Sequence, residues 1–116
     1  MRSRSPADDD GSVAAEFAVA LPAVALVLAL CVGAVGVGSQ QLRLQDAAAD
    51  AARGLGRGES TSAVQGRVSR AAPGSVLADW SSGELVCARL TVPARGPAAV
   101  AGLRLAAESC ALDGGR

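Results

Sequence analysis

The chain has 116 residues and a formal net charge of zero, with 11 arginines against 11 acidic residues. This balance gives no basic surface for nucleic acid, and one domain is expected at this length. Histidine is absent, and no nucleophile, phosphate-binding or redox motif occurs, which argues against an enzyme, a small-molecule substrate and a cofactor. Without histidine, the two cysteines of the C-terminal region are too few for a zinc site.

Residues 1–11 form a short polar leader. Arg2 and Arg4 are followed by the run Asp8–Asp10, and no hydrophobic pattern accompanies them. We therefore expect the leader to be disordered or removed. A conventional secretory signal peptide is disfavoured because it begins with a basic segment, whereas this leader has more aspartate than arginine.

A long apolar segment follows, and no residue from Phe17 to Leu42 carries a formal charge. As a helix, Phe17–Gly38 would be about 33 Å long, enough to cross a hydrocarbon core of about 30 Å. Pro22 should kink this helix near its start, which membrane helices tolerate. Small residues near its far end, with small-xxx-small spacing from Ala34 to Gly38, suggest packing against other helices: Gly33, Ala34, Gly36 and Gly38. The alternative is the general glycine and alanine enrichment of membrane helices.

The helical pattern continues beyond the apolar segment. Apolar residues recur at three- and four-residue spacing up to Leu55, and the glycine-rich run Gly54–Gly58 should end the helix. Arg43 with Asp46, and Asp50 with Arg53, have the i,i+3 spacing of helical ion pairs.

The rest of the chain predicts a second short helix and up to three strands. The helix spans Ser60 to Ala72, with Ser60 or Thr61 as its cap and Val64 and Val68 on one face. Turn residues separate three strand-like segments, which are Val76–Trp80, Leu85–Val92 and Leu103–Cys110. We expect an α+β fold with an antiparallel hairpin or three-strand meander packed on the long helix. The predicted organisation is a cleavable leader (1–11), a transmembrane and assembly helix (12–58) and a small exported domain (59–116).

Two cysteines lie on the last two predicted strands. Pairing of these strands would let Cys87 approach Cys110, and a disulfide would fit an oxidising, exported compartment. The alternative is two buried free thiols. The third cysteine, Cys31, follows Leu30 within the apolar helix, and the lipoprotein pattern needs a small residue there.

Glu16 stands at the head of the apolar segment. A charged carboxylate entering a bilayer is unfavourable unless it is protonated, moves to the interface or meets a cation. Cleavage after Gly11 would create an amino group at Ser12, and the amine of an adjacent subunit could pair with Glu16 and set the register. Alternatively, Glu16 only flanks the membrane. It is no capping-box residue, because that position is Ala15.

Residues 11–22, Gly-Ser-Val-Ala-Ala-Glu-Phe-Ala-Val-Ala-Leu-Pro, resemble the N-terminal signature of TadE-like proteins. These are minor pilins of the tight-adherence (Flp, type IVb) pilus system. The resemblance implies cleavage by a prepilin peptidase between Gly11 and Ser12. It also implies assembly through Glu16, Phe17 and Pro22, with other pilins and the Tad inner-membrane machinery as partners.

The resemblance implies a single-pass protein of the cell membrane, with a cytoplasmic N-terminus and an exported C-terminal domain that reaches the pilus or cell surface. The arginine count does not favour this orientation, since Arg2 and Arg4 precede the helix whereas Arg43, Arg53 and Arg57 follow it. The expected function is that of a minor pilin or pilin-like subunit in pilus biogenesis and adhesion. The alternative is a membrane-anchored structural protein without prepilin processing.

Overall fold

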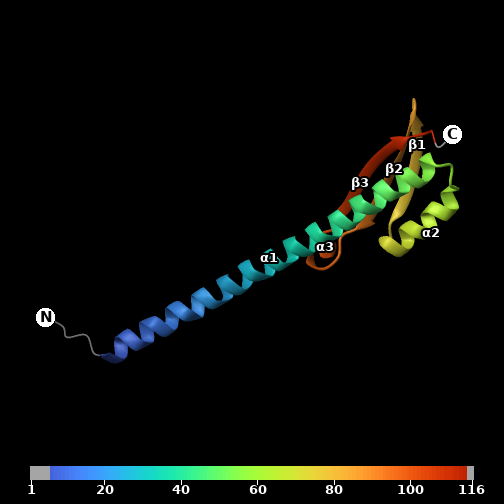
Figure 1. The fold of residues 1–116 in the computed structure, drawn as a ribbon. Coiled ribbons are helices and arrows are strands. Elements are labelled where there is room, and N and C mark those ends of the chain that lie inside the picture. The colour runs from blue at the N-terminus through green and yellow to red at the C-terminus, as the bar shows by residue number, and fades with distance from the viewer. Residues whose placement is uncertain (1–5, 115–116) are drawn as a thin grey trace. The chain divides into compact units, whose positions relative to one another are not determined.

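The computed structural model describes residues 6–114 and has an α+β fold (Figure 1). Its contacts divide the chain into an N-terminal unit that ends at Ala34 and a C-terminal unit that begins at Val35. The elements in chain order are α1 (Pro6–Gly56), α2 (Thr61–Ala71), β1 (Val76–Ser82), β2 (Leu85–Pro93), α3 (Pro97–Val100) and β3 (Arg104–Leu112). The predicted long helix, short second helix and antiparallel strands are all confirmed.

α1 begins earlier than the sequence suggested. Residues 1–5 lie outside the described residues, and the helix already starts at Pro6, so residues 6–11 are helical rather than disordered. The other alternative, removal of the leader, stays a prediction. Proline suits the first helical position because its missing N–H has no partner there, and aspartates near a helix N-terminus are favoured by the helix dipole. Further along, α1 continues through Pro22 without a break.

The last turns of α1 form one wall of the core. Leu44, Ala48, Ala51 and Ala52 are at most 1% exposed and Leu55 is 9% exposed, which confirms the predicted apolar spacing. They pack with Val64 and Val68 of α2 and with alternate residues of the central strand, Val86, Ala88, Leu90 and Val92. Both helices therefore cover the same face of the sheet (Figure 1).

The sheet is a three-stranded antiparallel meander in the order β1-β2-β3. β1 extends to Ser82, beyond its predicted end at Trp80, so the turn into β2 consists of Gly83 and Glu84. Gly83 has a φ of 63°, which a two-residue hairpin turn requires at this position and which glycine adopts without strain. α3 was not predicted; it begins with Pro97, directly after Gly96.

Three glutamine side chains bind backbone groups at the margins of the sheet. Gln40 of α1 donates to the Pro93 carbonyl at 3.1 Å and accepts from the Arg95 N–H at 2.9 Å. The neighbouring Gln41 donates to the Ala106 carbonyl of β3 at 2.9 Å. On the other side, Gln65 of α2 accepts from the Leu77 N–H of β1 at 3.2 Å. Gln41 and Gln65 thus occupy backbone groups of the two edge strands that could otherwise pair with a further strand.

Gly56 marks the closest approach of α1 to the sheet. A Cβ at this position would lie 2.6 Å from the Leu112 carbonyl oxygen of β3, and backbone atoms cannot move aside as a side chain can. Gly66 in α2 is the opposite case, because the space around its Cβ position is empty.

We predict that Gly56→Ala lowers the free energy of unfolding by about 1–3 kcal/mol through overpacking. The matched change Gly66→Ala should raise it by about 0.5–1 kcal/mol, since alanine favours an unstrained helix more than glycine does. Urea unfolding of the detergent-solubilised chain, followed by the fluorescence of Trp80, measures both. Equal effects of the two substitutions would contradict the proposed close packing at Gly56.

Candidate functional site in the N-terminal helix

The residues of the N-terminal signature all lie on α1. Gly11 and Ser12 are within the helix and exposed, and Glu16 follows Ser12 by about 6 Å along the helix axis. Within residues 10–114, no ion pair includes Glu16. Phe17 is 61% exposed, and Pro22 is also exposed. The predicted cleavage and assembly residues are thus all accessible on α1, and Glu16 has no ion-pair partner in that part of the chain.

The helix surface beyond Glu16 is apolar and exposed. An 18-residue window of this helix has a mean hydropathy of 2.6, and none of it is buried. The large side chains from Phe17 to Val35, including Leu21, Leu28 and Val32, are more than half exposed. So large a continuous apolar surface is rare in a soluble monomer. The helix is long and apolar enough to cross a membrane.

The small residues proposed for helix packing have open space around them. A Cβ added at Gly33, Gly36 or Gly38 would meet nothing within 4 Å. Together with Ala34, these glycines give α1 a surface without large side chains, which another helix could approach closely. Their role in packing stays a prediction.

The comparison with protein families bears on this same segment. The model of the family described as TadE-like protein matches residues 11–53, from the predicted cleavage site almost to the end of α1. This segment is similar to TadE-like proteins. The match confirms the resemblance seen in residues 11–22. No curated protein and no solved structure matches the chain.

In the C-terminal unit, the predicted disulfide is present. Cys87 and Cys110 are directly opposite each other on β2 and β3, so the bond joins the central strand to an edge strand. On the other side of β2, Cys87 is opposite Trp80 of β1. These residues lie on the sheet face that the helices leave uncovered. Cys31 is a free, exposed cysteine on α1.

The uncovered sheet face also has a short polar ladder next to the disulfide. Arg89 donates to Glu108 on the neighbouring strand, with Nη2 and Oε2 2.6 Å apart. The same guanidinium lies over the Trp80 ring, 5.4 Å from its centroid. Since Arg89 and Glu108 are roughly half exposed, this pair contributes little to stability beyond aligning the strands.

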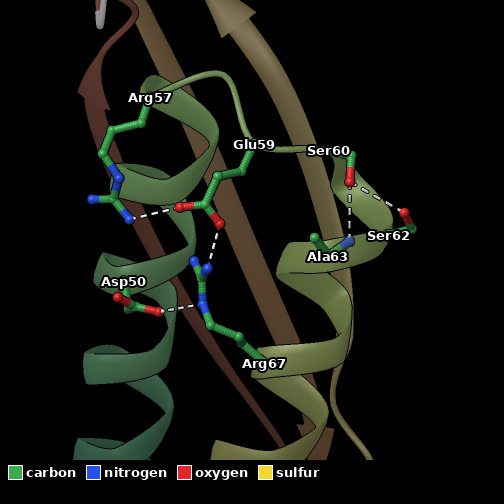
Figure 2. A network of polar contacts seen from close by, with 7 residues as sticks. All are labelled: Asp50, Arg57, Glu59, Ser60, Ser62, Ala63 and Arg67. Atoms are coloured by element: carbon green, nitrogen blue, oxygen red, sulfur yellow. Dashed lines mark hydrogen bonds and ion pairs between the residues drawn. The ribbon is translucent and has the colours of Figure 1, made fainter.

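A second charged cluster joins α1 to α2 (Figure 2). Arg67 of α2 contacts Glu59 in the interhelical turn and Asp50 of α1, the latter with 3.3 Å between Nε and Oδ2. Arg57 holds the other carboxylate oxygen of Glu59 at 2.8 Å. The predicted pairs Arg43–Asp46 and Asp50–Arg53 are not among the ion pairs of the described residues. The turn instead brings Arg67 back beside Asp50, a contact that i,i+3 reasoning within one helix misses.

Gly54 makes room for this cluster. The Arg67 Nη2 atom is buried, has no hydrogen-bond partner in the described structure, and would lie 2.5 Å from a Cβ at position 54. The adjacent groove between α1 and α2, of about 290 Å³, is lined by charges of both signs from Arg43, Asp46, Asp50 and Arg67. Within residues 10–114, no three His, Cys, Asp or Glu side chains come together as a metal site. The cluster is best explained as a connection between the two helices.

The cluster also shifts the pKa values of Glu59 and Arg67. Hydrogen bonds from Arg57 and then Arg67 hold the pKa of the Glu59 carboxyl below its ordinary value of 4.5. The hydrogen bond with Glu59 correspondingly raises the pKa of Arg67. Because folding lowers the pKa of Glu59, its contribution to stability is present above about pH 4.5 and is lost as the pH falls through the lowered value.

We predict that Glu59→Gln lowers the free energy of unfolding at pH 7 and that this difference from the unmodified chain shrinks below about pH 4. The reason is that protonated Glu59 and glutamine interact similarly with the two arginines. Urea unfolding between pH 3 and 8 measures the effect. Glu84→Gln is the matched control, since Glu84 is in no ion pair of the described residues. A difference that stays constant across this range would contradict the prediction.

Proposed function

We propose that the chain is a minor pilin or pilin-like subunit of a Tad (Flp, type IVb) pilus. The match of residues 11–53 to the TadE-like family carries this proposal. In this function the apolar part of α1 anchors the subunit in the cell membrane and then packs among the helices of other pilins. The work of the protein is assembly rather than catalysis.

Orientation follows from the disulfide rather than from charge. A stable bond between Cys87 and Cys110 is favoured in an oxidising compartment, so the C-terminal unit belongs on the exported side and the N-terminus in the cytoplasm. The arginine distribution gives no support for this orientation. We give the disulfide more weight, because its formation depends on the compartment of the C-terminal unit, whereas the positive-inside rule describes a bias in arginine and lysine counts.

Processing by a prepilin peptidase would convert Glu16 into an assembly residue. Cleavage between Gly11 and Ser12 creates a new amino group, and Glu16 becomes the fifth residue of the mature chain. In a bundle of subunits, the amine of one copy then meets the Glu16 carboxylate of the next. The exposed position of Glu16, without an ion-pair partner in the described chain, supports this role.

A second candidate function is a single-pass membrane-anchored structural protein that keeps its leader. One observation favours it: α1 is a continuous helix from Pro6 across Gly11 and Ser12, whereas a peptidase needs an extended backbone at the bond it cuts. Such a protein would use the same membrane helix and the same C-terminal unit. Glu16 would then only flank the membrane.

We predict that the chain purified from native membranes begins at Ser12. Intact mass and N-terminal peptide mapping measure this directly. Replacement of Gly11 by leucine should retain the leader, because a side chain would obstruct the backbone at the cut, whereas Ser12→Ala should still be processed. A native chain that begins at Met1 would favour the membrane-anchored alternative.

We also predict that Glu16→Ala abolishes recovery of the subunit in sheared pili while the protein remains in the membrane after alkaline carbonate extraction. Loss of the carboxylate removes the partner of the neighbouring amine. Immunoblots of the pilus and membrane fractions give both readouts, and Glu16→Asp, which keeps the charge, should restore part of the assembly. Normal incorporation of Glu16→Ala would exclude the register role.

A further inference from the structure

The loop between β2 and β3 exposes an apolar surface that the proposed function does not use. We define the α3 loop as residues 94–103, which contain the short helix α3. Val100 is 92% exposed and Leu103 is 46% exposed, and Pro97, Ala99 and Ala101 are exposed beside them. Val100 has the highest exposure among the large hydrophobic side chains of the described residues.

The exposure of this surface does not come from a poorly packed loop. Ala94 is buried, and Ala98 packs against the core of the C-terminal unit. Backbone hydrogen bonds close the loop on itself, from the Ala94 N–H to the Leu103 carbonyl at 2.8 Å and from the Leu103 N–H to the Ala98 carbonyl at 3.2 Å. A firmly held loop thus presents its apolar side chains to the outside.

The α3 loop is tied to α1 at the end of the apolar segment. The amide of Gln40 binds both the Pro93 carbonyl and the Arg95 N–H, so the loop begins within a side chain's length of residue 40. Gln40 is only about 3 Å along the helix beyond Gly38, where the predicted membrane span ends. Whatever position the two units take, this end of the C-terminal unit is close to the point where α1 leaves the hydrocarbon.

The charges around the loop fit a membrane surface. Arg95 and Arg104 flank the apolar segment, and no charged residue lies between them. No acidic residue occurs between Glu84 and Glu108, and neither flanking arginine is in an ion pair among the described residues. Apolar side chains bordered by arginines are typical of segments that enter the headgroup region of anionic bilayers.

We propose that the α3 loop is a second membrane contact, in which Val100 and Leu103 enter the interfacial region while Arg95 and Arg104 bind anionic lipid headgroups. The inference rests on the proposed membrane anchoring of α1, but not on prepilin processing or on a pilus. This contact holds the C-terminal unit against the bilayer.

Single-tryptophan variants of the full chain test this contact. Trp80→Phe combined with Val100→Trp places the only tryptophan on the loop. Trp80→Phe combined with Leu112→Trp is the matched control, because Leu112 is 70% exposed at the opposite end of β3. Both variants are reconstituted in phosphatidylcholine and phosphatidylglycerol vesicles, with or without bromine on the phosphatidylcholine acyl chains. The expected result is severalfold stronger quenching by brominated lipid for Val100→Trp than for Leu112→Trp.

Charge variants test the arginines separately. Arg95→Gln with Arg104→Gln, added to the Val100→Trp variant, should reduce quenching in vesicles that contain phosphatidylglycerol. Arg95→Gln keeps the N–H that bonds to Gln40, so the loop remains attached to α1. Quenching that is unaffected by both substitutions would overturn the role of the arginines in binding headgroups.

Three results would overturn the proposal as a whole, and each has a separate meaning. Equal quenching of both tryptophans, in protein that resists carbonate extraction, would leave α1 as an anchor but exclude the loop contact. Emission from Val100→Trp that depends on the protein-to-lipid ratio, and not on bromine, would show that a second copy of the chain covers the loop. Removal of the protein from vesicles by carbonate would overturn the membrane anchor and the loop contact together.

Discussion

The packing of an alanine-rich face of α1 is the interaction on which the C-terminal unit depends. Ala48, Ala51 and Ala52 are completely buried, and their small side chains let α2 and the sheet approach the helix backbone. The largest fully buried side chains are only leucines and valines, so this core is thin for an independent domain. Close contact between these small side chains compensates for the absence of large ones, because the dispersion attraction between atoms falls steeply with their separation. The disulfide and the cluster around Arg67 add constraints that a larger core would not need.

One helix serves two different environments. Up to about Leu42, α1 exposes large apolar side chains, and from Leu44 on it buries them on one face and shows charges on the other. The change occurs where Gln40 and Gln41 bind the backbone of the sheet. Polar amides suit this position because they satisfy backbone groups without placing a charge beside hydrocarbon. The family match spans this change of environment, since it covers residues 11–53 of α1.

In the connection between α1 and α2, a glycine that destabilises the helix locally makes room for a contact between the two helices. Gly54 lies within a helix, where glycine is unfavourable, but it gives the Arg67 guanidinium space against the α1 backbone. Arg67 then reaches both Glu59 and Asp50, and these charges fix the angle at which α2 returns along α1. Gly56, two residues further along α1, likewise leaves space for the backbone of the edge strand β3.

The sequence by itself determined the parts that depend on periodicity and on local chemistry. These include the apolar length of α1, its Leu44-to-Leu55 face, the alternation of β2 and the signature from Gly11 to Pro22. The sequence left Ser60 and Thr61 open as the cap of α2, and in the structure the cap is Ser60. Only the tertiary structure decided that Arg67 pairs with Asp50, that Cys87 stands directly opposite Cys110, and that the α3 loop is tied to Gln40. The physical reason is that periodicity reports which face of an element is buried, whereas contacts between residues far apart depend on turn geometry and strand register. The helical start at Pro6 was missed for a different reason, because the absence of a hydrophobic face excludes a core but does not exclude a helix.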